Sequence, residues 1–224
     1  MTEDEARAWL GARGWLDGIA LGRLERIAVL VAEENARQNL ISASTLPHIW
    51  SRHIVDSAQL LMLAGDAAGA GLWVDLGSGG GFPGLVIAAL RAAPILMVET
   101  RGLRARFLER CLADLGLDHA SVLQSRVERV ILDGPAAIVS ARAFASLDTT
   151  FAVASHLCDQ NSLWLLPKGR SAQMELETAS QQWQAAFHVE QSVTDPDSAI
   201  ITASGVKRRY AARPGPKPTR SRKA

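Results

Sequence analysis

The first 65 residues alternate apolar and polar positions with the period of an α-helix. Residues 45–63 carry one such pattern and residues 19–36 carry another, whose apolar side chains are expected on one helical face: Ile19, Leu24, Ile27 and Val31. Residues 64–71 contain only alanine, glycine and one aspartate, and they follow neither the helical nor the strand period. The pattern therefore predicts a helical N-terminal segment that ends in a linker.

Short runs rich in β-forming residues begin after the linker and alternate with segments that can form helices. Five such runs lie at Leu72–Leu76, Ile95–Glu99, Ser121–Gln124, Ala136–Ser140 and Ser162–Leu166. Strands that alternate with helices are typical of a parallel sheet covered on both faces. Two later runs, at 187–193 and 199–203, are separated by Thr-Asp-Pro-Asp and predict a hairpin. We therefore expect an α/β fold with a seven-stranded, mostly parallel sheet and an antiparallel last strand.

The composition is that of an ordinary globular domain, with 224 residues of which 48% are hydrophobic and 21% charged. A chain of this size needs no disulfide or metal to hold a core, so Cys111 and Cys158 are expected to be core thiols. No cluster of ligand-type residues supports a metal site. Because no run of about 18 apolar residues and no signal peptide is found, we expect a cytoplasmic protein without a membrane span.

The formal net charge of +1 conceals an uneven distribution along the chain. From Gly205 onwards there are eight basic residues and no acidic one, which leaves 16 basic and 23 acidic residues in positions 1–204, a net charge of −7. Such asymmetry indicates a polyanionic partner for the basic end, although a disordered solubilising tail is the alternative. We expect three parts: a helical extension at 1–64, an enzyme domain at 65–206 and a basic tail at 207–224.

A dense glycine motif follows the first predicted strand, with the sequence Asp75-Leu-Gly77-Ser-Gly79-Gly-Gly81-Phe82-Pro83-Gly84. It leaves a strand and enters a helix, which is where Rossmann-like folds bind a nucleotide cofactor. Gly79, Gly81 and Gly84 also satisfy the dinucleotide motif GxGxxG, with Glu99 at a suitable distance to meet a ribose. A methyl-donor site, a dinucleotide site and a structural turn are therefore the three interpretations of this loop.

Two residues of the loop favour a methyl donor over a dinucleotide. Asp75 ends the strand, where a carboxylate suits the ammonium group of S-adenosylmethionine better than it suits a pyrophosphate. Pro83 removes a backbone N–H from the first helical turn, which weakens anion binding there. Glu99, at the end of the second strand, would accept hydrogen bonds from the ribose hydroxyls of either ligand and does not discriminate between them.

Motifs in a fixed order along residues 39–218 resemble those of one family. They are Asn39-Leu40, Arg52-His53-Ile-Val-Asp56-Ser57, the glycine loop, Gln124-Ser-Arg-Val127-Glu128, Arg142-Ala-Phe-Ala-Ser-Leu147, Lys168-Gly169 and Tyr210…Arg213-Pro-Gly-x-x-Pro218. The chain resembles the RsmG (GidB) family, the 16S ribosomal RNA guanine-N7 methyltransferases of bacteria. The loop alone is common to many methyltransferases, whereas the ordered set is far more specific. The resemblance implies a Rossmann-like class I methyltransferase that uses S-adenosylmethionine.

The resemblance also implies which residues contact the cofactor: Gly77, Phe82, Val127, Glu128 and Arg142. Asp75, Gly79 and Glu99 join them on the argument from the loop itself. Val127 would flank the adenine, although a valine at this position also fits an ordinary core. Phe82 offers an aromatic face to the positive charge of a sulfonium.

Four residues are candidates for catalytic or substrate-holding roles: Arg52, His53, Arg142 and Lys168. Arg142 follows the fourth strand, where it would hold the methionine carboxylate or a substrate phosphate. The alternative is that it only braces the loop through a carboxylate such as Asp75 or Glu99. Lys168 ends the fifth strand, where a phosphate contact competes with the interpretation as an ordinary exposed lysine. Without the resemblance, His53 and Asp56 would be neighbours on a solvated helix face.

Methyl transfer to guanine N7 needs no general base, because N7 already carries a free lone pair, so catalysis is expected mainly from positioning. This edge of guanine is hidden in the deep groove of A-form RNA, which predicts an irregular or single-stranded target. We expect 16S rRNA or the small ribosomal subunit as partner, no metal, and a monomer. The alternatives are a methyltransferase for another RNA or a protein, a nucleotide-cofactor reductase, and a non-catalytic RNA-binding module on the same fold.

Overall fold

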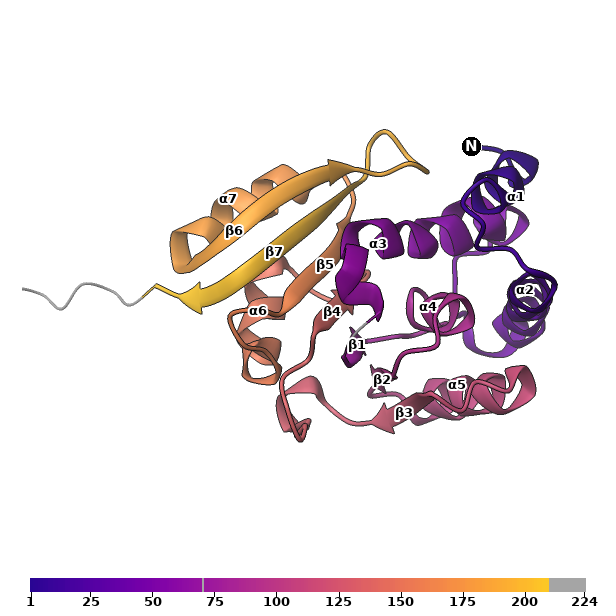
Figure 1. The fold of residues 1–224 in the computed structure, drawn as a ribbon, viewed down its shortest axis with the longest axis horizontal. Helices are drawn as coiled ribbons and strands as arrows, with labels where there is room; N and C mark the ends of the chain where they lie inside the picture. The colour runs from indigo at the N-terminus through magenta and orange to yellow at the C-terminus, as the bar shows by residue number, and fades with distance from the viewer. Residues whose placement is uncertain (70, 210–224) are drawn as a thin grey trace, which may run out of the picture.

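The computed structural model describes residues 1–69 and 71–209, and a seven-stranded sheet lies at its centre (Figure 1). The strands follow the order β3-β2-β1-β4-β5-β7-β6, and among these described strands β7 alone runs opposite to the other six. The strand bounds are β1 Trp73–Leu76, β2 Ile95–Glu99, β3 Ala120–Gln124, β4 Ile138–Ala141, β5 Leu163–Lys168, β6 Trp183–Gln191 and β7 Ala199–Arg208. The predicted α/β fold, with an antiparallel last strand, is confirmed.

The two C-terminal strands are longer than the sequence pattern predicted. β6 begins at Trp183 instead of Phe187, and β7 continues to Arg208 instead of ending at Ala203. β6 lies at the edge of the sheet, and most of its residues are partly or fully exposed. The apolar alternation that reveals a half-buried strand is therefore weak there. The two first residues expected in the tail, Lys207 and Arg208, belong to β7, and residues 210–224 lie outside the described residues.

Each face of the sheet carries its own helical layer, because successive side chains of a strand point to opposite faces. Trp73 and Met97 belong to the core shared with the first five helices, whereas Val74 and Val98 belong to the core shared with the last two. The helix bounds are α1 Glu3–Gly11, α2 Gly18–Gln38, α3 Asp56–Ala64, α4 Gly84–Leu90, α5 Gly102–Leu115, α6 Leu147–Ala154 and α7 Ala172–Gln182. Figure 1 shows α6 and α7 on the side of the sheet opposite α4.

The N-terminal segment is helical as expected, with two differences in detail. Leu24, Ile27 and Val31 are fully buried, but Ile19 is 68% exposed, so its assignment to the same face was wrong. Five residues separate Ile19 from Leu24, which rotates it by about 140° around the helix. Residues 45–63 form a short 3-10 helix, then the π-helix Trp50–Val55, then α3, instead of one regular helix.

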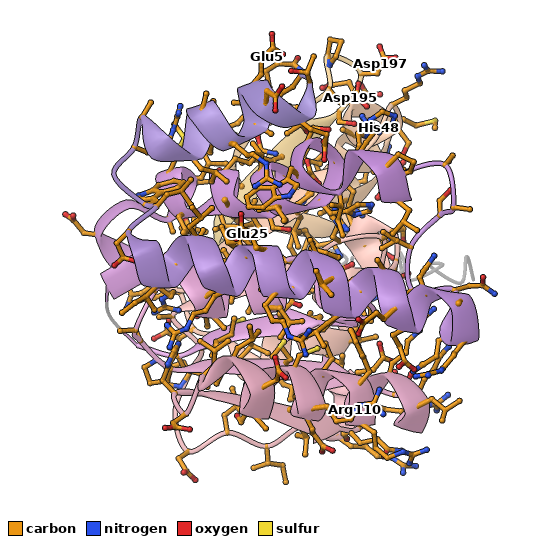
Figure 2. The ribbon with its side chains drawn as sticks, turned by 90° about the vertical axis from the view of Figure 1, so that its right-hand side faces the viewer. Glu5, Glu25, His48, Arg110, Asp195 and Asp197 are labelled. Carbon is orange, nitrogen blue, oxygen red and sulfur yellow. The ribbon has the colours of Figure 1, made fainter. Side chains whose placement is uncertain are left out.

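The helical extension shares one apolar core with the sheet and is fixed to it by polar contacts. The Arg26 guanidinium donates to both carboxylate oxygens of Asp114, at 2.7 and 3.0 Å, and Arg23 donates to the last carbonyls of α5. Figure 2 shows α2 lying between α1 and α5 on this side of the molecule. The expected linker after residue 64 includes a 3-10 helix, Gly65–Gly69. In the structure, the extension is therefore a layer of the fold.

Candidate active site

The glycine loop, residues 77–84, joins β1 to α4 at the carboxyl edge of the sheet. Gly77, Gly79 and Gly81 have φ angles of +64°, +57° and +93°, a region that residues with a Cβ rarely adopt. A Cβ on Gly84 would lie 2.6 Å from the sulfur of Met97, so α4 begins in direct contact with β2. The backbone path alone therefore requires glycine at these positions.

A cavity of about 250 Å³ lies beside this loop, and we call it the Glu99 cavity. Its walls come from the segments that follow four parallel strands, and they include Gly77, Glu99, Arg104, Val127, Ala143 and Phe144. A Cβ on Gly77 would lie 2.5 Å from the Phe144 ring, so the ring packs directly on the backbone of the loop. A cavity at the carboxyl ends of β1, β2, β3 and β4 is where open α/β sheets bind ligands.

Glu99 is 5% exposed at the end of β2, and the surrounding backbone fixes its carboxylate. One oxygen accepts a hydrogen bond from the Gly79 N–H at 2.9 Å, and the other accepts one from the Arg101 N–H at 2.8 Å. A carboxylate has room for further donors. Glu99 is therefore both a support of the glycine loop and an acceptor in the cavity wall, which is the position expected for a group that binds ribose hydroxyls.

Asp75 is completely buried beneath the loop. Its carboxylate accepts hydrogen bonds from the Ser140 hydroxyl at 2.7 Å and from the Gly84 N–H at 3.2 Å. Burial raises the pKa of Asp75 to about 6, against the effect of these donors. The Asp75 carboxylate therefore has no exposed surface on which a ligand ammonium could bind. Its hydrogen bonds connect β1 to β4 and to the start of α4.

Val127 and Glu128 begin a 3-10 helix after β3, and they face different surroundings. The Val127 side chain is buried and lines the Glu99 cavity, so its apolar packing and its place in a ligand wall coexist. Glu128 is exposed. The first N–H groups of a helix have no partner within that helix, so the backbone here offers donors to a ligand edge.

Arg142 stands just beyond β4 at the centre of a polar network. Its guanidinium donates to Asp56 Oδ2 at 2.9 Å, to His53 Nδ1 at 2.7 Å and to the carbonyl of Arg52 at 3.2 Å. The carboxylate that it meets is therefore Asp56. The next residue, Ala143, has a φ of +50°, and backbone strain at a residue other than glycine is common at functional sites.

His53 is buried between Arg142 and the loop residue Phe82. The Arg142 guanidinium can only donate, so His53 Nδ1 accepts and its Nε2–H donates to Thr45 Oγ1 at 2.9 Å. Burial, together with the positive charges of Arg142 and Arg52, lowers the pKa of His53 to about 3. The imidazole centroid lies 4.9 Å from that of Phe82, and the Arg142 guanidinium lies 5.4 Å from the same ring. His53 is thus a neutral residue with both nitrogens occupied.

A second cavity lies on the other side of Arg142, and we call it the Lys168 cavity. It shares Ala143 and Phe144 with the Glu99 cavity, and Arg142, Asp56 and Lys168 also line it. Lys168 is not free there: its Nζ donates to the Ala145 carbonyl at 2.6 Å and pairs with Glu175 at 2.8 Å. Residues 143–144 therefore form a wall between two adjoining cavities.

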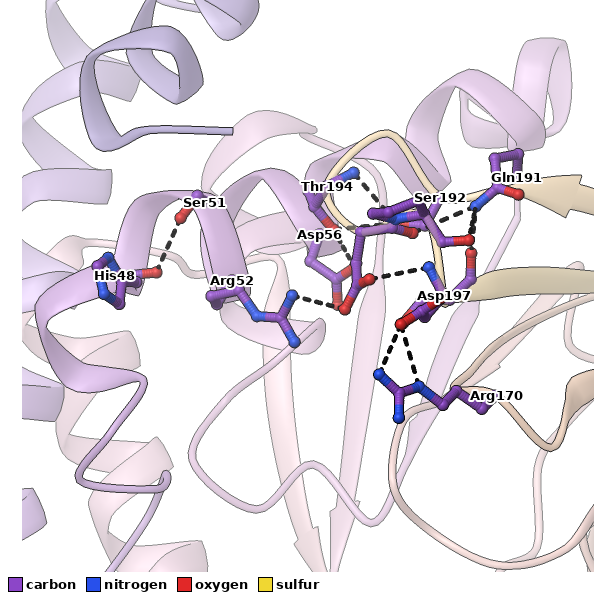
Figure 3. A network of polar contacts seen from close by, with 12 residues as sticks. His48, Ser51, Arg52, Asp56, Arg170, Gln191, Ser192, Thr194 and Asp197 are labelled. Carbon is purple, nitrogen blue, oxygen red and sulfur yellow. Dashed lines mark hydrogen bonds and ion pairs between the residues drawn. The ribbon is translucent and has the colours of Figure 1, made fainter.

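The loop 192–198, which joins β6 to β7, closes one side of this region. Arg52 pairs with Asp195 at 2.7 Å, Asp56 accepts from the Thr194 hydroxyl at 3.0 Å, and Gln59 bonds to Ser192 and to the Val193 N–H. Figure 3 shows Arg52 and Asp56 on their helix with Ser192 and Thr194 of the loop opposite them. Two segments more than 130 residues apart in the chain are thereby joined at the site.

The structure divides the expected site residues into two groups. Gly77, Glu99 and Val127 line the Glu99 cavity, Gly79 donates to Glu99, and Glu128 is exposed beside Val127. Arg52, His53, Phe82 and Arg142 form the network next to the cavity. The sequence argument missed Phe144 and Glu175, and it quoted Asp56 without a role. Phe144 lay within the quoted Arg-Ala-Phe motif, whereas no local pattern marked Glu175.

Comparison with known proteins explains this arrangement. The family model GidB, described as rRNA small subunit methyltransferase G, matches residues 21–199. The ribosomal RNA small subunit methyltransferase G of Novosphingobium aromaticivorans is 48% identical over 90% of this chain and 87% of its own. That of Rhizorhabdus wittichii is 46% identical over 93% of this chain and 95% of its own. The chain belongs to this family. The resemblance inferred from the ordered motifs is confirmed.

Solved structures support the fold of this family member independently of sequence. The glycopeptide N-methyltransferase MtfA, solved with S-adenosylmethionine, superposes with a TM-score of 0.57 at 10% identity, covering 68% of this chain and 93% of its own. The ribosomal protein L11 methylase of Lactobacillus delbrueckii superposes with a TM-score of 0.51 at 16% identity, covering 69% and 79%. The fold is that of class I methyltransferases. Within the described residues, no acidic, histidine or cysteine cluster suits a metal, and no helix is long and apolar enough to cross a membrane.

Proposed function

We propose that this family member transfers the methyl group of S-adenosylmethionine to N7 of a specific guanine in 16S rRNA. The observation that carries the proposal is the pair of adjoining cavities at the carboxyl edge, which share the wall of Ala143 and Phe144. One cavity offers the chemistry of a nucleoside site, and the other, lined by polar groups, lies directly beside it. A group-transfer enzyme needs two ligands held next to each other in this way.

The Glu99 cavity fits S-adenosylmethionine, which supplies an activated methyl group on a sulfonium. Glu99 would accept the ribose hydroxyls, the Val127 side chain and the Val127 and Glu128 N–H groups would hold the adenine, and Gly77 and Gly79 would border the ligand closely. Phe82 and Arg142 do not line this cavity and belong to the network that adjoins it at Ala143. They would lie near the methionine part of the ligand, with Arg142 held by Asp56. Asp75 has no exposed surface, so we assign it the positioning of the loop through the Gly84 N–H.

The network around Arg142 provides positioning, and its histidine is not a free base. N7 of guanine needs no deprotonation before it attacks, and His53, the histidine of this network, is neutral with both ring nitrogens engaged. The paired ions Arg142–Asp56 and Lys168–Glu175 would orient the base in the Lys168 cavity. Holding the reacting atoms at attack distance is worth up to about 7–11 kcal/mol of the barrier.

The dinucleotide interpretation of the loop is not favoured by its contacts. The Gly79 and Gly84 N–H groups, which would face a pyrophosphate, already donate to the carboxylates of Glu99 and Asp75. A bound pyrophosphate would have to replace these carboxylates as the acceptor of both N–H groups and would lie beside two acidic residues. The neutral adenosine and the ammonium of S-adenosylmethionine avoid this repulsion.

The proposal predicts methyl incorporation at one kind of site. Small ribosomal subunits that lack the modification are incubated with the protein and labelled S-adenosylmethionine, and the 16S rRNA is digested to nucleosides. We expect label in 7-methylguanosine. Label in another base, another RNA or a ribosomal protein would overturn the proposed substrate.

A glycine variant tests the cofactor site in a separate binding assay. Gly77→Val should abolish binding of S-adenosylhomocysteine in calorimetry, because its side chain would collide with Phe144 and φ is +64°. Gly134→Val is the matched control, since a Cβ at Gly134 meets no atom within 4 Å. Retained affinity in the Gly77 variant, or binding of NADH by the wild type, would contradict the assignment.

Three further expectations remain part of the proposal. An enzyme of small-subunit rRNA acts where ribosomes assemble, in the cytoplasm, and we propose that it acts as a monomer.

The basic segment beyond Arg209 would add phosphate contacts. Removal of this segment must start after Arg209 and not at Gly205, because β7 pairs Trp183 with Arg208 and the Arg209 N–H donates to the Gln182 carbonyl. RNA affinity and its salt dependence should then fall while cofactor affinity persists.

A further inference from the structure

The cations expected to meet substrate phosphates are already paired. Arg142 is 18% exposed at its side chain and bonds to Asp56, and Lys168 is 11% exposed and bonds to Glu175. A paired, half-buried cation contributes little net positive potential to the surface. The attraction for a polyanion at the active edge must therefore come from other residues.

Four arginines form a group at the same edge on the other side of the Glu99 cavity, and we call them the arginine rim: Arg101, Arg104, Arg106 and Arg126. Arg101 and Arg104 line the cavity itself. The Arg106 guanidinium lies about 3.5 Å from the position of a Cβ on Gly102, where the Gln124 side chain at the end of β3 is also close. Arg126 follows Gln124 by two residues, so all four lie where β2 and β3 end.

The arginine rim carries positive charge without acidic partners. Among the residues that the structure describes, none of its four members forms an ion pair within 4.0 Å, and Arg101, Arg106 and Arg126 are exposed. Of the acidic residues closest along the chain, Glu99 is buried and accepts from the loop, whereas Glu109 and Glu128 are exposed. Neither Glu109 nor Glu128 forms an ion pair with the rim in the part of the chain that the structure describes. By contrast, Arg110 at the middle of α5, labelled in Figure 2, pairs with Glu34 at 2.8 Å. The active edge therefore carries four arginines whose charge no ion pair offsets among the described residues.

We propose that the arginine rim binds the phosphates of the rRNA strand that flanks the target guanine, an inference that rests on the proposed function. Unpaired arginines next to a cofactor cavity suit phosphate groups, since their guanidinium forks bind phosphate with two hydrogen bonds. Such contacts carry no sequence information and fix the position of the strand. The rim then supplies the attraction for RNA, while the paired ions beyond Arg142 hold the base.

Charge reversal of the two rim residues outside the cavity wall tests this assignment. Arg106→Glu combined with Arg126→Glu leaves Arg101 and Arg104 in place. We expect the dissociation constant for a 16S rRNA transcript to rise by about tenfold or more and the slope of log affinity against log salt to become shallower by about 0.7–0.9 per lost contact. The affinity for S-adenosylhomocysteine should stay within about twofold, because neither residue lines the Glu99 cavity.

The control changes the same charge at a distant place. Arg7→Glu combined with Arg26→Glu alters two arginines of α1 and α2, whose ion pairs with Glu25 and Asp114 contribute about 0–1 kcal/mol. Arg7 is partly buried and its guanidinium lies 3.7 Å from the centre of the Trp50 ring, so the free energy of unfolding of this variant is measured together with its RNA affinity. Equal RNA affinity and salt slope in both double variants would overturn the role of the rim. If the wild type binds the transcript but methylates a different base, the proposed substrate fails while the comparison of variants still decides the rim.

Discussion

His53 shows how one residue can be fixed in a single protonation state by its neighbours. Its ring is buried against Phe82, and the guanidinium groups of Arg142 and Arg52 lie nearby. Protonation would place a third positive charge in this group and break the acceptance from Arg142. Because its pKa is lowered to about 3, His53 stays neutral and can accept the hydrogen bond that orients Arg142.

The lowered pKa makes His53 a source of pH-dependent stability. In the unfolded chain its pKa is about 6.5, so the unfolded state gains a proton first as the pH falls. The contribution of His53 is complete above about pH 6.5 and is lost progressively toward pH 3, by up to about 5 kcal/mol. His53→Gln stays neutral, so its free energy of unfolding should fall less between pH 6.5 and 4 than that of the wild type.

Urea unfolding at several pH values measures this difference. His188→Gln, on the exposed edge strand β6, is the matched control. If both variants follow the same pH profile, His53 does not provide the pH dependence. A lower stability of His53→Gln at pH 8 is expected in addition, because the ring packing on Phe82 is lost.

Residue chemistry at the site was predictable from sequence where it is local. The glycines, Glu99 and Val127 follow their strands directly, so their position at the carboxyl edge comes from the alternation of strands and helices alone. The partners of Arg142 and Lys168 were not predictable, because Asp56 lies 86 residues from Arg142 and Glu175 acts from the next helix. Sequence shows which charges exist, and only the fold shows which of them are neutralised.

At the scale of elements, the loop between β6 and β7 stabilises α3, the helix that carries Asp56 and Gln59. Gln59 of α3 is 3% exposed; it donates to Ser192 Oγ at 3.2 Å and accepts from the Val193 N–H at 3.0 Å. Its amide also donates to Asp56, the partner of Arg142. The loop is thereby connected to Arg142 through two residues of one helix.

Removing this amide should weaken both stability and activity. Gln59→Leu leaves the Val193 N–H without its acceptor and removes one of the donors to Ser192 Oγ, which keeps its contacts with Thr194. The expected cost is about 1–3 kcal/mol in the free energy of unfolding. Methyl transfer should fall as well, because Asp56 loses one support. Arg170→Ala is the control, because it removes another contact to the same loop. Arg170 follows β5, its side chain is 85% exposed and it pairs with Asp197 of the loop, so its loss should cost less than about 1 kcal/mol.

Thermal unfolding and initial rates distinguish the two loop variants. Equal stability of Gln59→Leu and Arg170→Ala would show that the buried amide does not hold the loop.

The sequence predicted the hairpin through its polar turn, but not the π-helix Trp50–Val55 that faces it. A π-helix has no distinct apolar period over six residues, so residues 45–63 read as one ordinary helix.

For the whole molecule, the first helix is coupled to the active edge through a carboxylate. Glu3 of α1 accepts from the Trp50 N–H at 2.9 Å, from the Ser51 N–H at 2.9 Å and from the Ser51 hydroxyl at 2.7 Å. These are the first N–H groups of the π-helix, which have no partner within the helix. Glu3 of α1 thus caps the π-helix that carries Arg52 and His53, although 47 positions separate Glu3 from Trp50 in the sequence.

Glu3→Gln tests this coupling, because the amide keeps one acceptor oxygen and turns its NH₂ group toward an N–H. We expect a loss of about 1–3 kcal/mol in the free energy of unfolding and a lower rate of methyl transfer, as the cap shifts with the helix below it. Asp4→Asn removes the neighbouring exposed carboxylate of the same helix turn and should cost less than about 1 kcal/mol. Chemical unfolding and single-turnover methylation measure both effects. If Glu3→Gln behaves like Asp4→Asn in both assays, α1 adds surface to the fold without organising the site.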